Sequence, residues 1–326
     1  MVIRYDKSWE MPWDNFILNK SVNGCFLHTR NFLGYHGTGK FIDHSLLFLK
    51  GDTLAAVMPA NEIPEKKELI SHQGSTFGGI IIGEGFTSSA SYDWIFSELL
   101  DYLSEKDFRR TIVRTSSWLY YRTNMHIELL DYYFQMQGFR GQNDVGFFIE
   151  LANITDEFEN SFTHLKKRKL KKARFHNLAF RRLDSTQDVC TFYAILSDNM
   201  KKFSTTPLHT LDELLEFKKV RLKDIVSFYG VFHGTEMIAG SMVFDFNNKR
   251  VFHTQYLASR HDRLELCPNE FLYVSLMKEA KAQGFQFLSF GTATLNHGEV
   301  FNKNLAQYKE GFHSESYVNR TYILEV

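Results

Sequence analysis

The same order of secondary-structure elements is predicted twice along the chain. Residues 44–150 and residues 225–326 each carry patterns typical of strand, strand, strand, helix, strand, helix and strand, in that order. The first hairpins of the two halves match best, with turns at Gly51-Asp52 and Gly234-Thr235. A duplicated unit of this size predicts two like domains, and clefts between domains are common places for small-molecule sites.

The element types predict an α+β fold. Hairpin strands followed by alternating helices and strands are typical of mixed, mostly antiparallel sheets flanked by helices. The chain has 326 residues, enough for two domains that each have a core. We therefore expect one domain over 1–151 and another over 152–326. Apolar residues at helical spacing from Tyr92 to Leu103 predict an amphipathic helix in the first domain.

The composition argues against several classes of protein. The formal net charge is zero, so no overall field attracts the chain to nucleic acid or to a membrane. Cys25, Cys190 and Cys267 lie far apart without a CxxC pair, which argues against a zinc ribbon or a disulfide framework. No apolar run approaches the roughly 18 residues of a membrane span, and the N-terminus lacks the apolar core of a signal peptide. We expect a cytoplasmic protein, and no sequence pattern predicts a metal site.

Three stretches of the chain carry a resemblance to a known family. The first is the basic run 165–174 with the strand expected at 179–183, the second is the helix, glycine and strand of 269–291, and the third is 304–312, which ends in Tyr308-Lys309-Glu310-Gly311-Phe312. In this order they resemble the GNAT acyltransferase unit. The tandem arrangement resembles the FemAB-type transferases and FemAB-like N-acyltransferases, and the resemblance covers nearly the whole chain.

The resemblance implies an N-acyltransferase with two tandem GNAT-like domains. Such an enzyme moves an acyl or aminoacyl group from a thioester or ester donor to an amine. The acceptor implied is a cell-envelope precursor or an amino sugar used in surface polysaccharide biosynthesis. A non-catalytic binding module on the same fold stays open as an alternative.

The donor also stays open. GNAT enzymes that use acetyl-CoA hold its pyrophosphate in a glycine-rich cradle at a helix N-terminus. The matching residues, 259–269, contain no glycine, although Gly78-Gly79 and Gly83-Glu84-Gly85 occur in the first half. Acyl-CoA, an acyl-carrier protein and aminoacyl-tRNA are therefore alternative donors, the last as in a peptidoglycan-type transferase.

The resemblance also implies where the reaction occurs. In a GNAT-type sheet the strands matching 250–258 and 285–290 separate, so that backbone N–H groups can donate to the acyl carbonyl. The candidate catalytic residues are His253 as the proton acceptor, Tyr256 as a donor to the leaving group and Lys309 as the group that holds a phosphate or an oxyanion. Each also has a structural interpretation: a hydrogen-bonded strand histidine, a packed tyrosine, and a lysine that faces the C-terminal end of the helix dipole.

Polar residues on or near the same strands are candidates for substrate binding. In the second half these are Gln255, Ser289, Thr292 and Asn296, and the resemblance of the terminal motif adds Tyr308. In the first half, the polar stretch 71–79 supplies His72 and Gln73 as the opposite wall of the expected cleft.

The basic run predicts contact with an anion. Seven cations occupy the nine positions 166–174, and like charges one helical turn apart repel one another. Arg168, Lys172 and Arg174 are the candidates to bind the anion. The alternatives for this anion are a nucleotide sugar, a lipid phosphate, an RNA acceptor stem and the 3′-phosphate of CoA. The structural alternative is a solvated helix partly neutralised by acidic residues at 156, 157 and 159.

Overall fold

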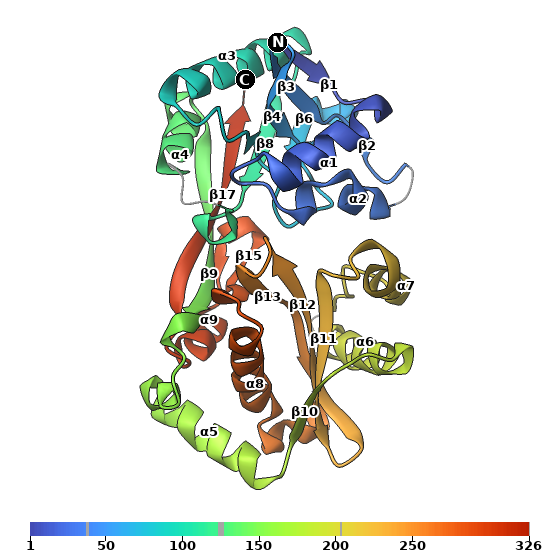
Figure 1. The fold of residues 1–326 in the computed structure, drawn as a ribbon, viewed down its shortest axis with the longest axis vertical. Helices are drawn as coiled ribbons and strands as arrows, with labels where there is room; N and C mark the ends of the chain where they lie inside the picture. Colours follow the sequence, from blue (N-terminus) through green and yellow to red (C-terminus); the bar gives the residue numbers. More distant parts are fainter. Residues whose placement is uncertain (37–38, 123–126, 203, 326) are drawn as a thin grey trace. The chain divides into compact units, whose positions relative to one another are not determined.

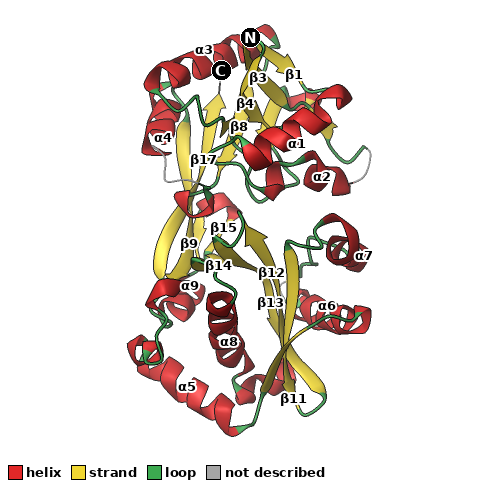
Figure 2. Cartoon of the chain, in the orientation of Figure 1, coloured by secondary structure: helices red, strands yellow, loops and turns green. Residues whose placement is uncertain are grey.

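The computed structural model describes residues 1–36, 39–122, 127–202 and 204–325. They form two compact units: unit 1 comprises residues 1–145, 294–301 and 318–326, and unit 2 comprises 146–293 and 302–317. Both contain mixed, mostly antiparallel sheets with helices against them (Figures 1 and 2), so the predicted α+β fold is confirmed.

Unit 1 contains two groups of paired strands (Figure 1). One pairs β1 (Val2–Arg4), β3 (Leu46–Lys50), β4 (Thr53–Met58) and β7 (Ile81–Ile82) in that order. The other runs from β17 (Glu315–Glu325) through β8 (Arg110–Thr115), β6 (Glu68–Ser71) and β5 (Asn61–Ile63) to β2 (Ile42–Asp43). The predicted turn at Gly51 joins β3 to β4, with a φ of +60° that suits glycine.

The core of unit 1 forms against its longest helix. Unit 1 includes α1 (Glu10–Asn19), α2 (Arg30–Leu33), α3 (Ser89–Glu105) and α4 (Ile127–Met136). Ser88 caps α3 by accepting a hydrogen bond from the Ser91 amide. The apolar residues predicted to share a face, from Tyr92 to Leu103, are buried in one hydrophobic cluster with residues of β3, β4 and β8. Each large side chain of this kind stabilises the fold by about 1.5–3 kcal/mol through burial.

Unit 2 is built on one sheet in the order β10 (Ala179–Arg182), β11 (Val226–His233), β12 (Glu236–Phe246), β13 (Val251–Ser259), β14 (Phe287–Thr292) and β9 (Arg140–Glu150). All neighbouring strands are antiparallel except β13 and β14, which are parallel. The helices are α5 (His164–Phe175), α6 (Thr186–Lys201), α7 (Leu211–Glu216), α8 (Pro268–Ala282) and α9 (Lys303–Glu310). Helices α6 and α8 both contact β12 and β13, and Figure 2 shows them on opposite faces of these strands.

Each sequence repeat ends in a strand of which a part belongs to the compact unit formed mainly by the other repeat. Strand β9 ends the first repeat, but its residues 146–150 belong to unit 2, where they pair with β14. Strand β17 ends the second repeat, but its residues 320–325 pair with β8 of unit 1. A short hairpin of β15 (Thr294–Leu295) and β16 (Val300–Phe301) also belongs to unit 1. The division expected after residue 151 separates the two sequence repeats. The compact units instead include segments from both repeats, because residues 294–301 and 318–326 belong to unit 1.

Candidate functional site

Strands β13 and β14 are paired only over their first three residues. The pairs are Val251 with Phe287, Phe252 with Leu288 and His253 with Ser289. Beyond Ser289 the described residues of the two strands do not pair, although β13 continues to Ser259 and remains paired with β12. The predicted separation of these strands is thus confirmed. It leaves one edge of β13 without a neighbouring β14 strand from Thr254 onward.

A β-bulge lies on β13 directly after the point of separation. Val243 of β12 pairs with Thr254 and Met242 pairs with Tyr256, so Gln255 is the additional residue. A bulge of this kind bends its strand and turns the local peptide groups out of the regular ladder. Backbone donors are therefore reoriented at the opening between the strands.

Polar side chains that are buried or partly buried meet at the last strand pair. His253 Nδ1 lies 3.1 Å from Ser289 Oγ, and Ser289 Oγ lies 3.1 Å from the Tyr317 hydroxyl. The Gly291 amide also donates to Ser289 Oγ at 3.2 Å, which fixes the turn at the end of β14. The structure thus brings together the predicted residues His253 and Ser289. Tyr317 was not predicted, because nothing in the sequence distinguishes it from other strand tyrosines.

The environment keeps the His253 ring neutral. Its pKa is lowered to about 4, first by burial and second by the positive charge of Lys309, and a hydrogen bond with the Gln255 side chain opposes part of this shift. A group with this pKa is a poor proton acceptor at neutral pH. The geometry favours His253 as a neutral hydrogen-bonding group at the opening.

Lys309 reaches the same opening from α9. Its Nζ donates to the carbonyl oxygens of Gly291 at 2.9 Å and Thr292 at 2.7 Å, and only 3% of the residue is exposed. Burial lowers its pKa to about 7, and no carboxylate of the described residues forms an ion pair with it. A neutral lysine amine has two N–H donors and one lone pair. Both donors are used here, which leaves the lone pair without a hydrogen bond among the described residues.

Three further predicted residues of the second half, Tyr256, Thr292 and Asn296, have different surroundings. Tyr256 contacts His209, with its hydroxyl 2.7 Å from Nδ1, and burial raises the pKa of Tyr256 to about 12. His209 precedes α7 and has no sequence signal beyond its residue type. Thr292 takes part through its backbone carbonyl. Asn296 is exposed in unit 1, in the β15–β16 turn.

The two candidates of the first half also lie in unit 1. Gln73 exchanges hydrogen bonds with Asn61 at 2.9 Å, through both its side chain and its backbone amide. His72 is buried, and its Nδ1 accepts from the Gly74 amide at 3.1 Å. Both residues therefore belong to an ordered turn after β6.

The cations of α5 fall into two sets. Lys166 and Lys169 contact Glu270 Oε1 of α8, with their Nζ atoms at 3.1 and 3.3 Å, and Arg174 pairs with Glu159 at 2.6 Å. Arg168 and Lys172 are exposed, and no described carboxylate forms an ion pair with either. Part of the charge predicted to meet an external anion is thus neutralised inside unit 2.

The first turn of α8 does not fit the pyrophosphate of CoA. Its N-cap Cys267 has a left-handed φ of +55°, and Pro268 at the first helical position has no N–H to donate. The Glu270 carboxylate, 3% exposed, already occupies the first turn, where a phosphate would meet the helix dipole. Lys166 Nζ covers this carboxylate and lies 3.0 Å from the centre of the Tyr308 ring, so Tyr308 is packed beneath it.

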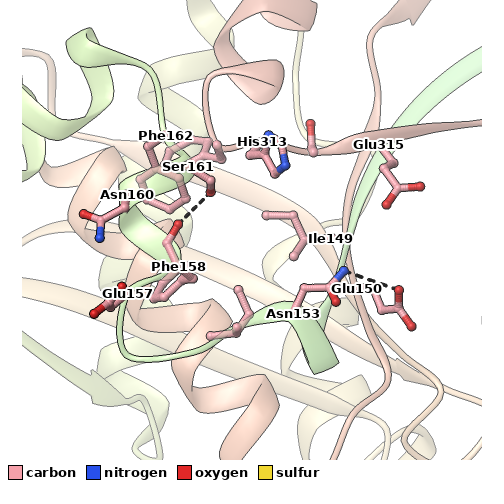
Figure 3. A pocket seen from close by; sticks show the side chains of 13 residues that line it. Ile149, Glu150, Asn153, Glu157, Phe158, Asn160, Ser161, Phe162, His313 and Glu315 are labelled. Atoms are coloured by element: carbon pink, nitrogen blue, oxygen red, sulfur yellow. Dashed lines mark hydrogen bonds between the residues drawn. The ribbon is translucent and has the colours of Figure 1, made fainter.

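A cavity of about 460 Å³ lies elsewhere in unit 2 (Figure 3). Phe158, Phe162 and Phe312 are among its apolar lining residues, whereas Glu150, Glu157 and Glu315 supply carboxylates. No residue predicted for the site lines this cavity. In the part of the chain that the structure describes, no group of three His, Cys, Asp or Glu is arranged to hold a metal, and no helix is long and apolar enough to cross a bilayer.

The fold is that of the tandem GNAT-type and FemAB-like transferases. The solved structures with this fold include FemX, which is 10% identical with a TM-score of 0.68, over 100% of this chain and 97% of that one. The C-terminal domain of a putative lysylphosphatidylglycerol synthetase from Agrobacterium fabrum is 13% identical, with a TM-score of 0.58 over 86% of this chain and 84% of that one.

A tandem GNAT protein from the clavulanic acid biosynthesis pathway shares the fold as well. It is 7% identical, with a TM-score of 0.55, over 100% of this chain and 98% of that one. No protein-family model and no curated protein matches the chain. The resemblance predicted from the sequence is confirmed at the level of the fold.

Proposed function

We propose that this protein transfers an acyl or aminoacyl group to an amine, and that the reacting carbonyl binds where β13 and β14 separate. The observation that carries the proposal is the position of Lys309, whose buried amine is held by two carbonyls at the end of β14. The fold shared with FemX and a tandem GNAT protein supports the same reaction class. The acceptor that we propose is an amine on a cell-envelope precursor or an amino sugar.

Lys309 serves as the general base. Its pKa of about 7 gives both protonation states near neutral pH, which is the range in which a general base works best. The acceptor amine attacks the carbonyl carbon, and the Lys309 lone pair takes the proton that the new amide nitrogen loses. The same proton then passes to the leaving oxygen or sulfur as its bond to carbon breaks.

The negative charge of the tetrahedral intermediate is stabilised by backbone donors of β13. The bulge at Gln255 and the strand edge beyond Thr254 supply peptide groups at the opening. Donors fixed before the reaction can lower the barrier by about 3 kcal/mol each. His253 and Ser289 maintain the local geometry, and Gln255 and Tyr256 are assigned to substrate contact.

The donor that we favour is an ester or a thioester that does not depend on a pyrophosphate at the first turn of α8. Glu270 and Pro268 make that turn unsuitable for the diphosphate arm of CoA. Aminoacyl-tRNA and an acyl-carrier protein both satisfy this condition. Arg168 and Lys172, exposed on α5, are the cations assigned to an anionic part of such a donor.

A donor panel tests this proposal. The protein is incubated with an amino sugar and with acetyl-CoA, an acylated carrier protein or charged tRNA, and mass spectrometry detects the amide. We expect an amide from charged tRNA or the carrier protein, and loss of roughly 100-fold or more of the rate in Lys309→Met. Lys303→Met, an exposed change at the start of the same helix, is the matched control. An equal rate in Lys309→Met and in wild type would contradict the mechanism.

A further inference from the structure

Unit 1 contains a cavity of about 350 Å³ that is separate from the residues assigned to the transfer reaction. It is lined by residues that include Tyr5, Arg30, Phe41, Asp43 and His72. Helix α2 supplies Arg30, and the turn after β6 supplies His72. Two of these residues are buried polar groups whose hydrogen bonds are incomplete.

Arg30 is the first of these groups. It is 8% exposed, and its Nη1 donates to the Asp43 carboxylate at 2.6 Å. Its Nε and Nη2 have no hydrogen-bond acceptor among the described residues. These two nitrogens form one edge of the guanidinium, and two parallel N–H donors on an edge match a carboxylate or a phosphate.

The position of Arg30 is fixed by aromatic residues. Its guanidinium carbon lies 3.4 Å from the centre of the Tyr5 ring and 4.1 Å from the centre of the Trp13 ring. Such contacts stabilise a cation but accept none of its conventional hydrogen bonds. An unpaired buried donor costs about 1–3 kcal/mol, and an acceptor from outside the chain at the free edge of Arg30 would remove this cost.

His72 is the second group. It is 4% exposed, and its Nδ1 accepts from the Gly74 amide at 3.1 Å, so the neutral ring carries its hydrogen on Nε2. This Nε2–H has no acceptor among the described residues. The turn is held by His36, whose Nε2 lies 2.7 Å from the Gly74 carbonyl oxygen. A Cβ on residue 74 would lie 1.9 Å from that nitrogen, so a larger residue there would displace the His36 ring.

We infer that this cavity binds an oxyanion, a carboxylate or a phosphate group, which accepts hydrogen bonds from the free edge of Arg30 and from His72. The neighbouring rings of Tyr5 and Phe41 give the rest of such a ligand an apolar contact. This inference does not depend on the proposed transfer reaction, because it concerns binding to unit 1 alone.

Titration calorimetry on the full chain tests the inference, with inorganic phosphate in one series and acetate in another. Nitrogen resonances of the histidine rings, followed by NMR, report contact with His72. We expect saturable binding of at least one anion, a shift of the His72 Nε2 resonance, and affinity roughly tenfold or more weaker in Arg30→Gln and in His72→Phe. Binding of phosphate alone identifies a phosphate site, and binding of acetate alone identifies a carboxylate site.

Two further measurements keep the result decisive. Arg182→Gln removes an exposed arginine of β10 in unit 2 and is expected to bind as the wild type does. If Arg30→Gln does not fold, the affinity of His72→Phe and the NMR titration of the wild type still test whether the anion binds at this cavity. The inference would be overturned if the wild type bound neither anion saturably. It would also be overturned if the His72 resonance of the wild type did not shift and a folded His72→Phe variant bound the anion as tightly as the wild type.

Discussion

Lys309 donates a hydrogen bond from Nζ to the carbonyl oxygen of Thr292 at 2.7 Å, which ties the last turn of α9 to the end of β14. A second bond from the same Nζ to Gly291 completes its contacts with main-chain oxygens. A buried lysine without a carboxylate partner destabilises the folded protein while it is charged. Its position at the opening of the sheet, despite this cost, is the reason to assign it a chemical role.

Replacement of Lys309 by methionine is expected to stabilise the protein at pH 7. Methionine has a similar length and fills the same space without a charge. One unit of pKa shift corresponds to about 1.4 kcal/mol between the charged and the neutral form, so the lowered pKa of Lys309 costs stability that methionine does not. Urea unfolding of Lys309→Met and of the exposed Lys303→Met control checks this, and a less stable Lys309→Met would show that the lysine is held for structure.

The same lysine predicts a pH dependence of stability. Its pKa is lowered from 10.5 to about 7 in the folded state, so between these values the unfolded chain binds more protons. The contribution of Lys309 to the free energy of unfolding therefore rises from pH 7 toward pH 10.5. Urea midpoints measured across this range should increase less in Lys309→Met than in the wild type. Identical slopes would contradict the lowered pKa.

Acid is expected to destabilise the protein through the partly buried His253. The pKa of His253 is lowered from 6.5 to about 4 by burial, so protonation favours the unfolded chain. Stability from this group is present above pH 6.5 and is lost as the pH falls toward 4. In His253→Gln, the loss of stability over this interval should be smaller than in the wild type. The exposed His164→Gln change serves as the control, and its loss of stability between pH 6.5 and pH 4 should equal that of the wild type.

The ion pair between α5 and α8 gives a further prediction. Glu270→Ala leaves Lys166 buried without its carboxylate, which is expected to cost about 3–5 kcal/mol of stability. The double variant Lys166→Met and Glu270→Leu removes both charges and should recover most of that loss. Thermal unfolding of the single variant, the double variant and the exposed Glu310→Ala control measures the difference. A double variant as unstable as Glu270→Ala would mean that packing, and not charge, sets the cost.

Local sequence patterns predicted much of the fold. The spacing from Tyr92 to Leu103 predicted α3, and Gly51 and Gly234 marked hairpin turns, because both signals depend on neighbouring residues. The exchange of β9 and β17 could not be predicted, since a strand pattern does not specify its partner. Short strands such as β5 and β6 have too few residues for a clear period.

The candidate site was predictable only in part. The family resemblance named His253, Ser289 and Lys309 as candidates, and the structure brings them to the end of β14. Tyr317 and His209 were missed because their partners are distant in sequence. The count of cations on α5 suggested an external anion, but Glu270, about 100 residues away, neutralises Lys166 and Lys169.

The pKa of Lys309 is the most direct test of the proposed base. Lysine Cε resonances are followed by NMR between pH 5 and pH 11, and the Lys309→Met spectrum identifies the signal that belongs to Lys309. We expect this signal to titrate near pH 7, far below the ordinary value of 10.5. A Lys309 signal that titrates near 10.5 would leave the side chain charged at neutral pH, unable to accept a proton from the amine, and would contradict the account.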